Sequence, residues 1–220
     1  MTAEETVRAI YISSDIAVDD FESSLWVRSP PVRIARYWSG APAPASRQAE
    51  ARILWSNSAL FVRFLGPQAE PLVISPTPQL ETKTLGLWDR DVCEIFVAPD
   101  SATPNHYFEF EAAPTGEWVD LAIKKNAGGR DTDFAFRSGM TAAAAIRADQ
   151  ILVAMRIPWS DALPQPKPGD RWCINLFRCV GRDPDRGYVT WRPTYAPEPN
   201  FHHPEVFGCL LFDDEAKDQE

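Results

Sequence analysis

Residues 87–111, LWDRDVCEIFVAPDSATPNHYFEFE, decide the fold. Apolar residues alternate with their neighbours at every second position in 92–97 and again in 107–111, which is the pattern of a β-strand with one face in a core. The segment between these runs, 99–105, is dense in turn-forming residues. The stretch therefore predicts an antiparallel β-hairpin.

The predicted hairpin gathers glutamates on the face that points away from the core. With a loop centred near Ala102, Glu94 lies opposite Glu109 and Val92 lies opposite Glu111. Like charges opposite one another destabilise a sheet by a few tenths of a kcal/mol or more. An arginine, a cation or a ligand rich in hydroxyl donors would compensate for them.

Trp88 precedes the first strand of the hairpin and could stand at the rim of this acidic face. An aromatic ring packs against the C–H surface of a sugar, and an ionised carboxylate accepts strong hydrogen bonds from hydroxyls, so the pair suggests a sugar site. The alternative for an isolated hairpin is that Trp88 is a strand-end core residue and the glutamates form a solvated face.

Composition limits the class of protein. The 220 residues are 45% hydrophobic and 11% aromatic, which is enough to build a folded core. The net charge of −9 argues against nucleic acid or an anionic membrane as a partner, because both attract concentrated Lys and Arg. The four cysteines lack metal-ligand spacing, so we expect buried free thiols.

The apolar patterns predict a single domain over 10–212, between a flexible arm at 1–9 and a disordered acidic tail at 213–220. The start of the sequence has no signal-peptide pattern, so we expect a cytoplasmic protein, or a secreted one only if the start is misassigned.

Alternating runs predict roughly ten short strands joined by proline-containing loops. They lie at residues 9–12, 51–55, 60–65, 92–97, 107–111, 117–123, 151–157, 171–180, 188–191 and 206–212. Residues 66–86 read as a loop with one possible short strand at 72–74. Residues 141–147 fit either a helix or a strand, 124–133 are predicted to form an exposed flexible loop, and 158–163 resemble one helical turn. The expected fold is all-β, a two-sheet antiparallel β-sandwich of the immunoglobulin-like or jelly-roll-like kind.

The chain resembles the family 9 carbohydrate-binding modules, in a stand-alone form related to the DOMON β-sandwiches. The resemblance covers most of 10–212 and is carried by WDRDVCEIFV at 88–97, YFEFEAAPTGEW at 107–118 and NFHHPEVFG at 200–208. It implies non-catalytic binding of a mono- or oligosaccharide, with two aromatic residues on either side of a sugar ring, often the reducing end. A carboxylate and several amide or basic side chains would bind the hydroxyls.

Matched motif by motif, the resemblance implies that Trp88 is the first aromatic, Phe201 the second and Glu94 the carboxylate. Phe201 stands where a tryptophan is expected, and two further glutamates replace an expected arginine and asparagine. The full set of candidate ligand-binding residues is Trp88, Glu94, Glu109, Glu111, Arg178, Asn200, Phe201 and His202. Since carboxylates only accept hydrogen bonds, Arg178, Arg192 or a bound cation would balance the acidic cluster.

No catalytic cofactor is expected, but some members of the family hold a structural Ca²⁺. Asp89 and Asp91 are the candidate ligands, although neither belongs to a calcium-loop signature. His202 and His203 are adjacent in an extended segment and point to opposite sides, so they do not both ligate one ion.

Two other functions compete with sugar binding. A retaining glycosidase would use two carboxyls roughly 5 to 5.5 Å apart, which Glu94 and Glu109 satisfy loosely. A structural or protein-binding sandwich would present its acidic face to a basic partner, whose identity the sequence leaves unknown.

Overall fold

The computed structural model describes residues 6–214, where the regular structure is β-strand and short 3-10 helix. The strands are β1 (Thr6–Tyr11), β2 (Val32–Ile34), β3 (Arg36–Tyr37), β4 (Ala49–Trp55), β5 (Ala59–Pro67), β6 (Val92–Ala98), β7 (His106–Ala112), β8 (Trp118–Asn126), β9 (Gly129–Asp133), β10 (Thr141–Ile146), β11 (Gln150–Pro158), β12 (Arg171–Val180), β13 (Gly187–Thr190) and β14 (Gly208–Asp213). The 3-10 helices are η2 (Ser24–Arg28), η3 (Ala45–Arg47), η4 (Leu87–Asp89) and η5 (Pro204–Val206). None of these helices is long and apolar enough to cross a membrane.

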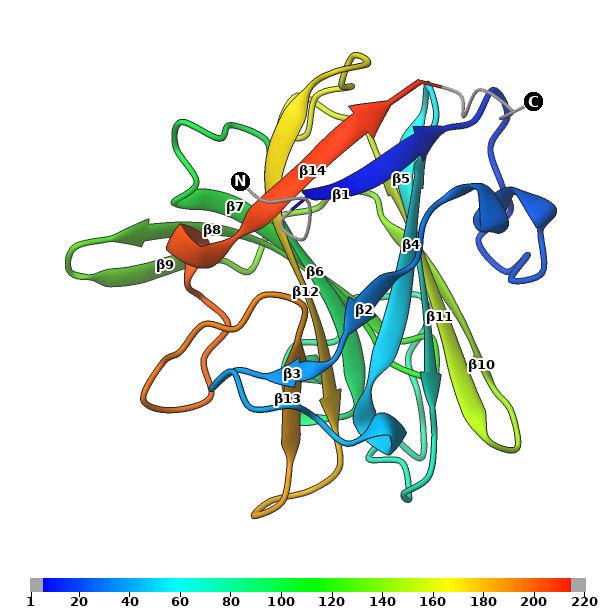
Figure 1. Ribbon diagram of the computed structural model, residues 1–220, viewed down its shortest axis with the longest axis vertical. Helices are drawn as coiled ribbons and strands as arrows, with labels where there is room; N and C mark the ends of the chain where they lie inside the picture. Colours follow the sequence, from blue (N-terminus) through cyan, green and yellow to red (C-terminus); the bar gives the residue numbers. More distant parts are fainter. Residues whose placement is uncertain (1–5, 215–220) are drawn as a thin grey trace.

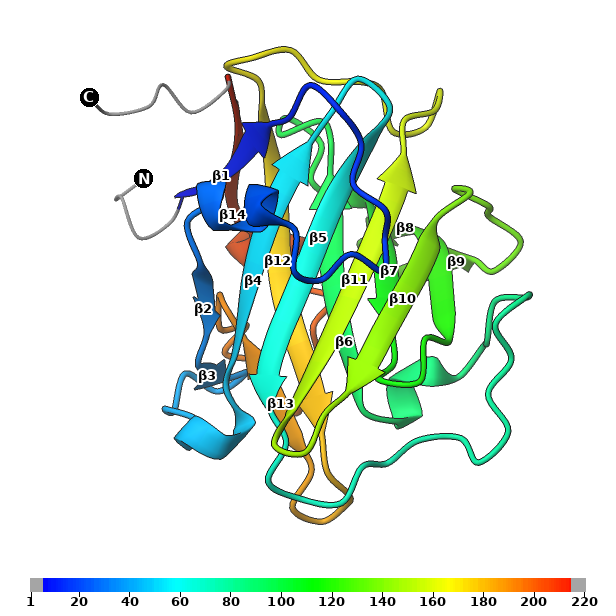
Figure 2. The same cartoon turned by 90° about the vertical axis from the view of Figure 1, so that its right-hand side faces the viewer.

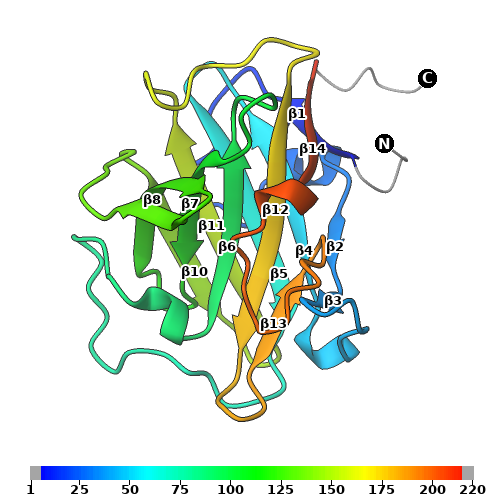
Figure 3. The ribbon, with the colours of Figure 1, turned by 90° about the vertical axis from the view of Figure 1, so that its left-hand side faces the viewer.

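The strands form one continuous sheet that curls over on itself. Its hydrogen-bonded order is β10-β11-β5-β4-β1-β14-β12-β6-β7-β8-β9, with β2, β3 and β13 attached at the margins. The half containing β4, β5, β10 and β11 faces the half containing β6 and β12 (Figures 1 and 2), and Figure 3 shows the same two layers from the opposite side. The prediction of an all-β fold is confirmed.

The expected pair of separate antiparallel sheets is replaced by this single mixed sheet. The difference lies in β1, which pairs in parallel with both β4 and β14 and so joins the two halves. This pairing satisfies backbone donors and acceptors of β4 and β14 that would otherwise lie at an open edge of the sheet. β1 begins at Thr6, four residues before the expected domain start, so residues 6–9 belong to the sheet. The rest of the expected arm and residues 215–220 of the expected tail lie outside the described residues.

The main core fills the space between the two halves. Val62 and Val153 contribute from one half, and Ile95, Phe110 and Leu176 contribute from the other. Because side chains alternate along each strand, the residues between these core positions on β6, β7 and β12 point to the outer face of the sheet. That outer face is covered by a second apolar cluster, which the loop residues Leu87 and Phe201 complete.

The β6–β7 hairpin forms as predicted, but its register differs by two residues. Glu94 pairs with Glu111, and Phe96 pairs with Glu109. Asp100 holds a tight turn by accepting hydrogen bonds from the Ala102 amide and the Thr103 hydroxyl. A shift of two residues keeps every side chain on its expected face, since the side-chain period of a strand is two.

Three local predictions are wrong. Residues 124–133 form the β8–β9 hairpin in place of a flexible loop, with a turn that ends at Gly129, whose φ is +142°. Residues 158–163 form no helical turn, because Pro158 ends β11 and bends follow only at 161–163. The Trp159 amide and indole donate to the Ser58 and Ser56 carbonyls. Residues 72–74 form no strand. The undecided segment 141–147 is the edge strand β10, which pairs with β11.

Candidate functional site

A pocket of about 320 Å³ opens on the outer face of β6, β7 and β12. Seven of the eight predicted ligand-binding residues line it: Trp88, Glu94, Glu109, Glu111, Asn200, Phe201 and His202. They come from two adjacent strands and from the two loops that cover this face. The structure therefore brings together residues that are more than 100 positions apart in the sequence.

Three glutamates form the floor of the pocket. Glu94 on β6 and Glu109 and Glu111 on β7 are each at most 3% exposed. One carboxylate oxygen from each lies within 4.8 Å of the others. The alternative of a solvated acidic face is wrong, because the loops carrying Leu87 and Phe201 cover the strands around these carboxyls.

Burial changes the protonation of this floor. It raises the pKa of Glu94 to about 8, with a further contribution from the neighbouring Glu109. Burial also raises the pKa of Glu109, and it raises that of Glu111 well above the ordinary range, where the charges of Glu94 and Glu109 add to the effect. Burial therefore favours the protonated form of all three carboxyls.

Few donors reach these carboxyls. The Cys179 thiol lies 3.4 Å from Glu94 Oε1, and burial raises the pKa of that thiol, so it remains a donor. Neither oxygen of Glu111, and not Glu109 Oε2, receives a hydrogen bond from another residue of 6–214. The Glu109 carboxyl lies within hydrogen-bonding reach of Glu111 but can donate only when it is protonated.

Arg178, the predicted balancing cation, lies elsewhere. It is buried on the opposite face of β12, where it donates to the backbone carbonyls of Gln48 and Pro67 at 2.7 Å each. The prediction was wrong for a simple reason of strand parity. Phe177 belongs to the outer cluster and Cys179 lines the pocket, so the residue between them points the other way.

Trp88 stands at the mouth of the pocket and is 37% exposed. It belongs to the short helix η4, which Gly86 precedes in the left-handed conformation with φ +80°. The Arg186 guanidinium donates to the carbonyls of Trp88 and Asp89 at 2.7 Å each and to that of Arg90. This clamp fixes the backbone that carries the indole.

Another wall of the pocket is aromatic, and its rings are largely covered by their neighbours. Phe201 is 8% exposed and stacks on Phe177 at 4.0 Å between ring centroids, with Tyr188 against it edge to face. One face of Phe201 is therefore covered, and this ring forms a wall more than a free platform. Phe134, which is 49% exposed, supplies a further aromatic surface at the rim.

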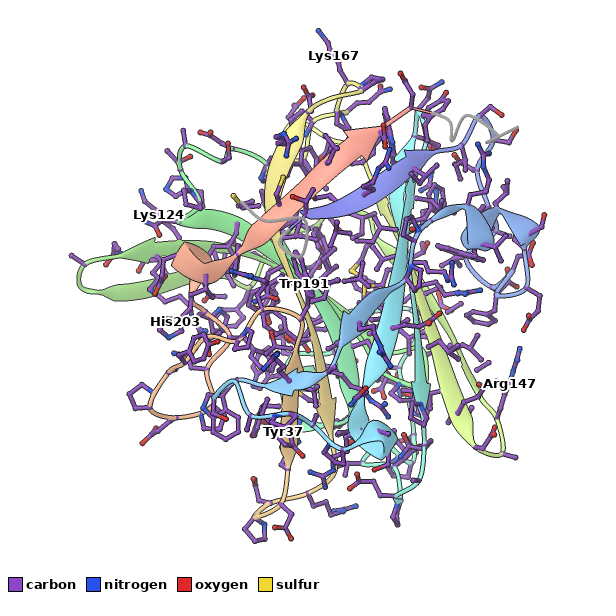
Figure 4. All side chains as sticks on the ribbon, viewed as in Figure 1. Tyr37, Lys124, Arg147, Lys167, Trp191 and His203 are labelled. Carbon is purple, nitrogen blue, oxygen red and sulfur yellow. The ribbon has the colours of Figure 1, made fainter. Side chains whose placement is uncertain are left out.

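His202 closes one side of the pocket as a neutral ring. Its Nδ1 lies 2.9 Å from the Tyr107 hydroxyl, and its Nε2 lies 3.9 Å from Glu109 Oε2. Burial lowers its pKa to about 3. His203, which is labelled in Figure 4, does not line the pocket. Its Nδ1 lies 2.8 Å from Glu205 Oε1. The two histidines point to different sides, as predicted.

Asp89 and Asp91 do not converge on a common ligand. Asp89 is exposed at the rim of the pocket. Asp91 is buried, accepts a hydrogen bond from the Gly181 amide at 2.8 Å, and does not line the pocket. The acidic residues of 6–214 whose carboxylate oxygens gather within 4.8 Å are instead the three glutamates of the floor.

Sequence reasoning missed part of the pocket. Arg130 and Thr132 reach it from β9, Phe134 from the segment after β9, and Tyr188 from β13. The first three alternate after the Gly128–Gly129 turn, and that alternation was the signal for a strand whose one side faces the site.

Comparison with known proteins gives a family and a fold. The model of the carbohydrate family 9 binding domain-like proteins matches residues 18–215. No curated protein matches the chain. A proposed carbohydrate-binding protein from Bacteroides uniformis has a similar structure, with a TM-score of 0.69 at 15% identity over 95% of this chain and 99% of that chain.

Two structures of a family 9 carbohydrate-binding module from Caldicellulosiruptor kristjanssonii are also similar. The complex with cellotriose has a TM-score of 0.62 at 17% identity, over 98% of this chain and 97% of that chain. The complex with glucose has a TM-score of 0.63 at 16% identity, over 96% of this chain and 98% of that chain. At these identities the likeness establishes the fold.

Proposed function

The chain belongs to the carbohydrate family 9 binding domain-like family, and from this premise we propose that it binds a carbohydrate in the Trp88 pocket without transforming it. One observation carries the proposal. A partly exposed indole stands at the mouth of a pocket whose floor consists of three buried carboxyls. An aromatic face beside a cluster of hydrogen-bond acceptors matches the two surfaces of a sugar ring, its C–H face and its hydroxyls.

The proposed roles follow from position. Trp88 stacks on the ring, the floor carboxyls accept hydrogen bonds from hydroxyls, and the Asn200 amide at the rim can both donate and accept. A volume of about 320 Å³ is at the small end for ligand pockets, which favours one sugar unit or the end of an oligosaccharide over a length of polysaccharide.

The chemistry of the floor favours binding over hydrolysis. A glycosidase separates its two carboxyls into a protonated acid and an ionised base or nucleophile by giving them different surroundings. Here the same burial raises the pKa of Glu94, Glu109 and Glu111 together. The glutamates line a concave pocket, which is the shape of a small-molecule site. They do not form the flat acidic face that the alternative of a protein-binding sandwich requires.

The first ligands to test follow from the relatives. Because the family 9 module of Caldicellulosiruptor kristjanssonii has been solved with cellotriose and with glucose, glucose and its β-linked oligomers are the natural probes. Their reduced forms report whether a free reducing end is required.

We expect Trp88→Ala to weaken sugar binding at least tenfold, about 1.4 kcal/mol, because it removes the stacking surface. Isothermal titration calorimetry with glucose, cellobiose and cellotriose should give dissociation constants between about millimolar and micromolar. Tyr195→Ala is the matched control, since Tyr195 is 68% exposed and lies outside the pocket. Equal binding by the wild type and the Trp88 variant, or no binding of any sugar, would overturn the proposal.

A further inference from the structure

The floor of the pocket contains buried carboxyl oxygens that receive no hydrogen bond from the described residues. Glu111 is fully buried, faces the pocket and receives no hydrogen bond at either oxygen from another side chain or backbone amide of 6–214. Glu109 Oε2 is also buried and receives no hydrogen bond from the described residues. A buried carboxylate without a partner costs several kcal/mol, so such a group is normally paired, protonated or bound to a cation.

The nearest arginines offset only part of this effect. The charge of Arg186 lowers the pKa of Glu94 and Glu111, and that of Arg130 lowers the pKa of Glu109, but burial outweighs both. Arg178 is on the far side of β12, and Arg186 directs three of its hydrogen bonds to the carbonyls of residues 88–90. Arg130 lines the pocket but is exposed. The space over the carboxyls therefore suits a cation from solution, which the open mouth of the pocket admits.

We propose that Glu94, Glu109 and Glu111 bind a divalent cation of the Ca²⁺ type at the floor of the pocket. The ligand set consists of carboxylate oxygens, which hard cations prefer. Oxygens on opposite sides of a Ca²⁺ ion, each about 2.3 to 2.6 Å from it, are roughly 4.6 to 5.2 Å apart. That is the largest separation that two oxygens bound to one ion can have. One oxygen from each of the three glutamates lies within 4.8 Å of the others, which is inside this limit.

The same geometry leaves the ion accessible from the pocket. Ca²⁺ takes six to eight oxygen ligands, and three glutamates supply between three and six of them. The remaining positions face the pocket, where two adjacent hydroxyls of a sugar ring would complete the coordination. This last step rests on the proposed function, whereas binding of the metal does not.

The test of the metal site uses the whole protein, freed of metal with a chelator and then dialysed. Calorimetric titration with CaCl₂ at pH 8 should give one ion per chain, with a dissociation constant between about micromolar and millimolar. Glu111→Gln and Glu94→Gln should each weaken binding at least tenfold. Glu81→Gln, which changes an exposed glutamate outside the pocket, should leave it unchanged. Thermal melts establish that each variant is folded.

Three results would overturn the metal site. The first is absence of Ca²⁺ binding by the folded wild type. The second is Ca²⁺ binding that both glutamine variants retain, which would place the ion elsewhere. The third is binding of glucosamine, a protonated amino sugar, that depends on Glu111 while CaCl₂ gives no heat, which would identify the cation as an ammonium group.

A second titration separates this inference from the proposed function. Glucose and cellobiose are titrated into the wild type with CaCl₂ and with chelator, and we expect at least a tenfold loss of affinity on chelation. Glu111-dependent Ca²⁺ binding without binding of any sugar would retain the metal site and overturn the proposed function. Trp88-dependent sugar binding without Ca²⁺ binding would retain the proposed function and overturn the metal site.

Discussion

At the scale of single residues, the floor glutamates combine a predictable position with an unpredictable environment. Strand alternation assigns Glu94, Glu109 and Glu111 to one face from the sequence alone. Their burial depends on loops that start outside the hairpin, and burial is the main cause of their raised pKa values. The sequence alone shows that these glutamates share one face, whereas their raised pKa values depend on loops that only the tertiary structure brings over them.

We expect the metal-free protein to lose stability as the pH rises from 7 to 8. The ordinary pKa of a glutamate is 4.5, and in the folded protein that of Glu94 is about 8 and that of Glu111 is well raised. In this window the folded state binds more protons than the unfolded state, so the free energy of unfolding falls with pH. His202 does not oppose the effect, because its ordinary pKa of 6.5 leaves it mostly neutral in both states above pH 7.

Thermal melts in the presence of a chelator measure this change. A fall of about 1.4 kcal/mol per proton and pH unit corresponds to a Tm lower by roughly 3 to 6 °C. Glu111→Gln should flatten the dependence and melt above the wild type at pH 8, since the variant has no carboxyl at this position that must take up a proton on folding. A Tm that is equal at pH 7 and pH 8 for the wild type would contradict the raised pKa values.

At the scale of elements, the loop 68–91 between β5 and β6 delivers Trp88 to the pocket (Figure 2). Loops longer than about 15 residues are uncommon in compact domains and are usually functional. This loop is anchored by Lys83, a buried side chain whose ammonium group lies 2.8 Å from Asp120 Oδ1. The same ammonium group donates to the carbonyls of Asp120 and Phe136, so it fastens the loop to β8 and to the segment after β9.

Lys83→Met should destabilise the protein by roughly 3 to 5 kcal/mol, because it leaves the buried Asp120 carboxylate without its counter-ion. Urea unfolding measures the loss. Adding Asp120→Asn to the Lys83 variant should recover part of it, since the uncompensated charge is then removed. Lys125→Met is the control, because Lys125 pairs with the exposed Glu205 at the surface and should contribute under about 1 kcal/mol. A loss no larger than that of the control would argue against the anchor.

At the scale of the whole molecule, the curled sheet depends on the strands that join its halves. β14 lies between β1 and β12, and its Phe212 packs edge to face against Trp55 and Trp172 with ring centroids 5.6 and 4.7 Å away. Trp55 belongs to one half of the sheet and Trp172 to the other. The last strand therefore ties both halves into one core.

Phe212→Ala should destabilise the protein by about 3 to 5 kcal/mol through the cavity that it leaves. Leu211→Ala on the same strand is the control, since Leu211 is only half-buried and should contribute less than half as much. Tryptophan fluorescence and circular dichroism should follow one transition, because the halves share a core. Separate transitions for the two probes would indicate that the halves unfold independently.

The sequence alone determined most of the long strands, the faces of the central hairpin and the family. Period-two alternation located β6, β7, β11 and β12, and the motifs at 88–97, 107–118 and 200–208 carried a resemblance that the family match confirms. It also named seven residues of the pocket. Strand parity, a local property of the chain, assigned the three glutamates, and the motifs of the family resemblance supplied Trp88 and the residues at 200–202.

Only the tertiary structure decided which arginine side chains face the pocket, how deeply the glutamates are buried and how the two halves of the sheet are joined. Arg178 lies behind β12, β9 adds a wall to the site, and β1 joins the halves in parallel. These outcomes depend on contacts between segments far apart in the sequence. Such contacts form only when the curled sheet brings its strands and covering loops together, so no single stretch of sequence contains them.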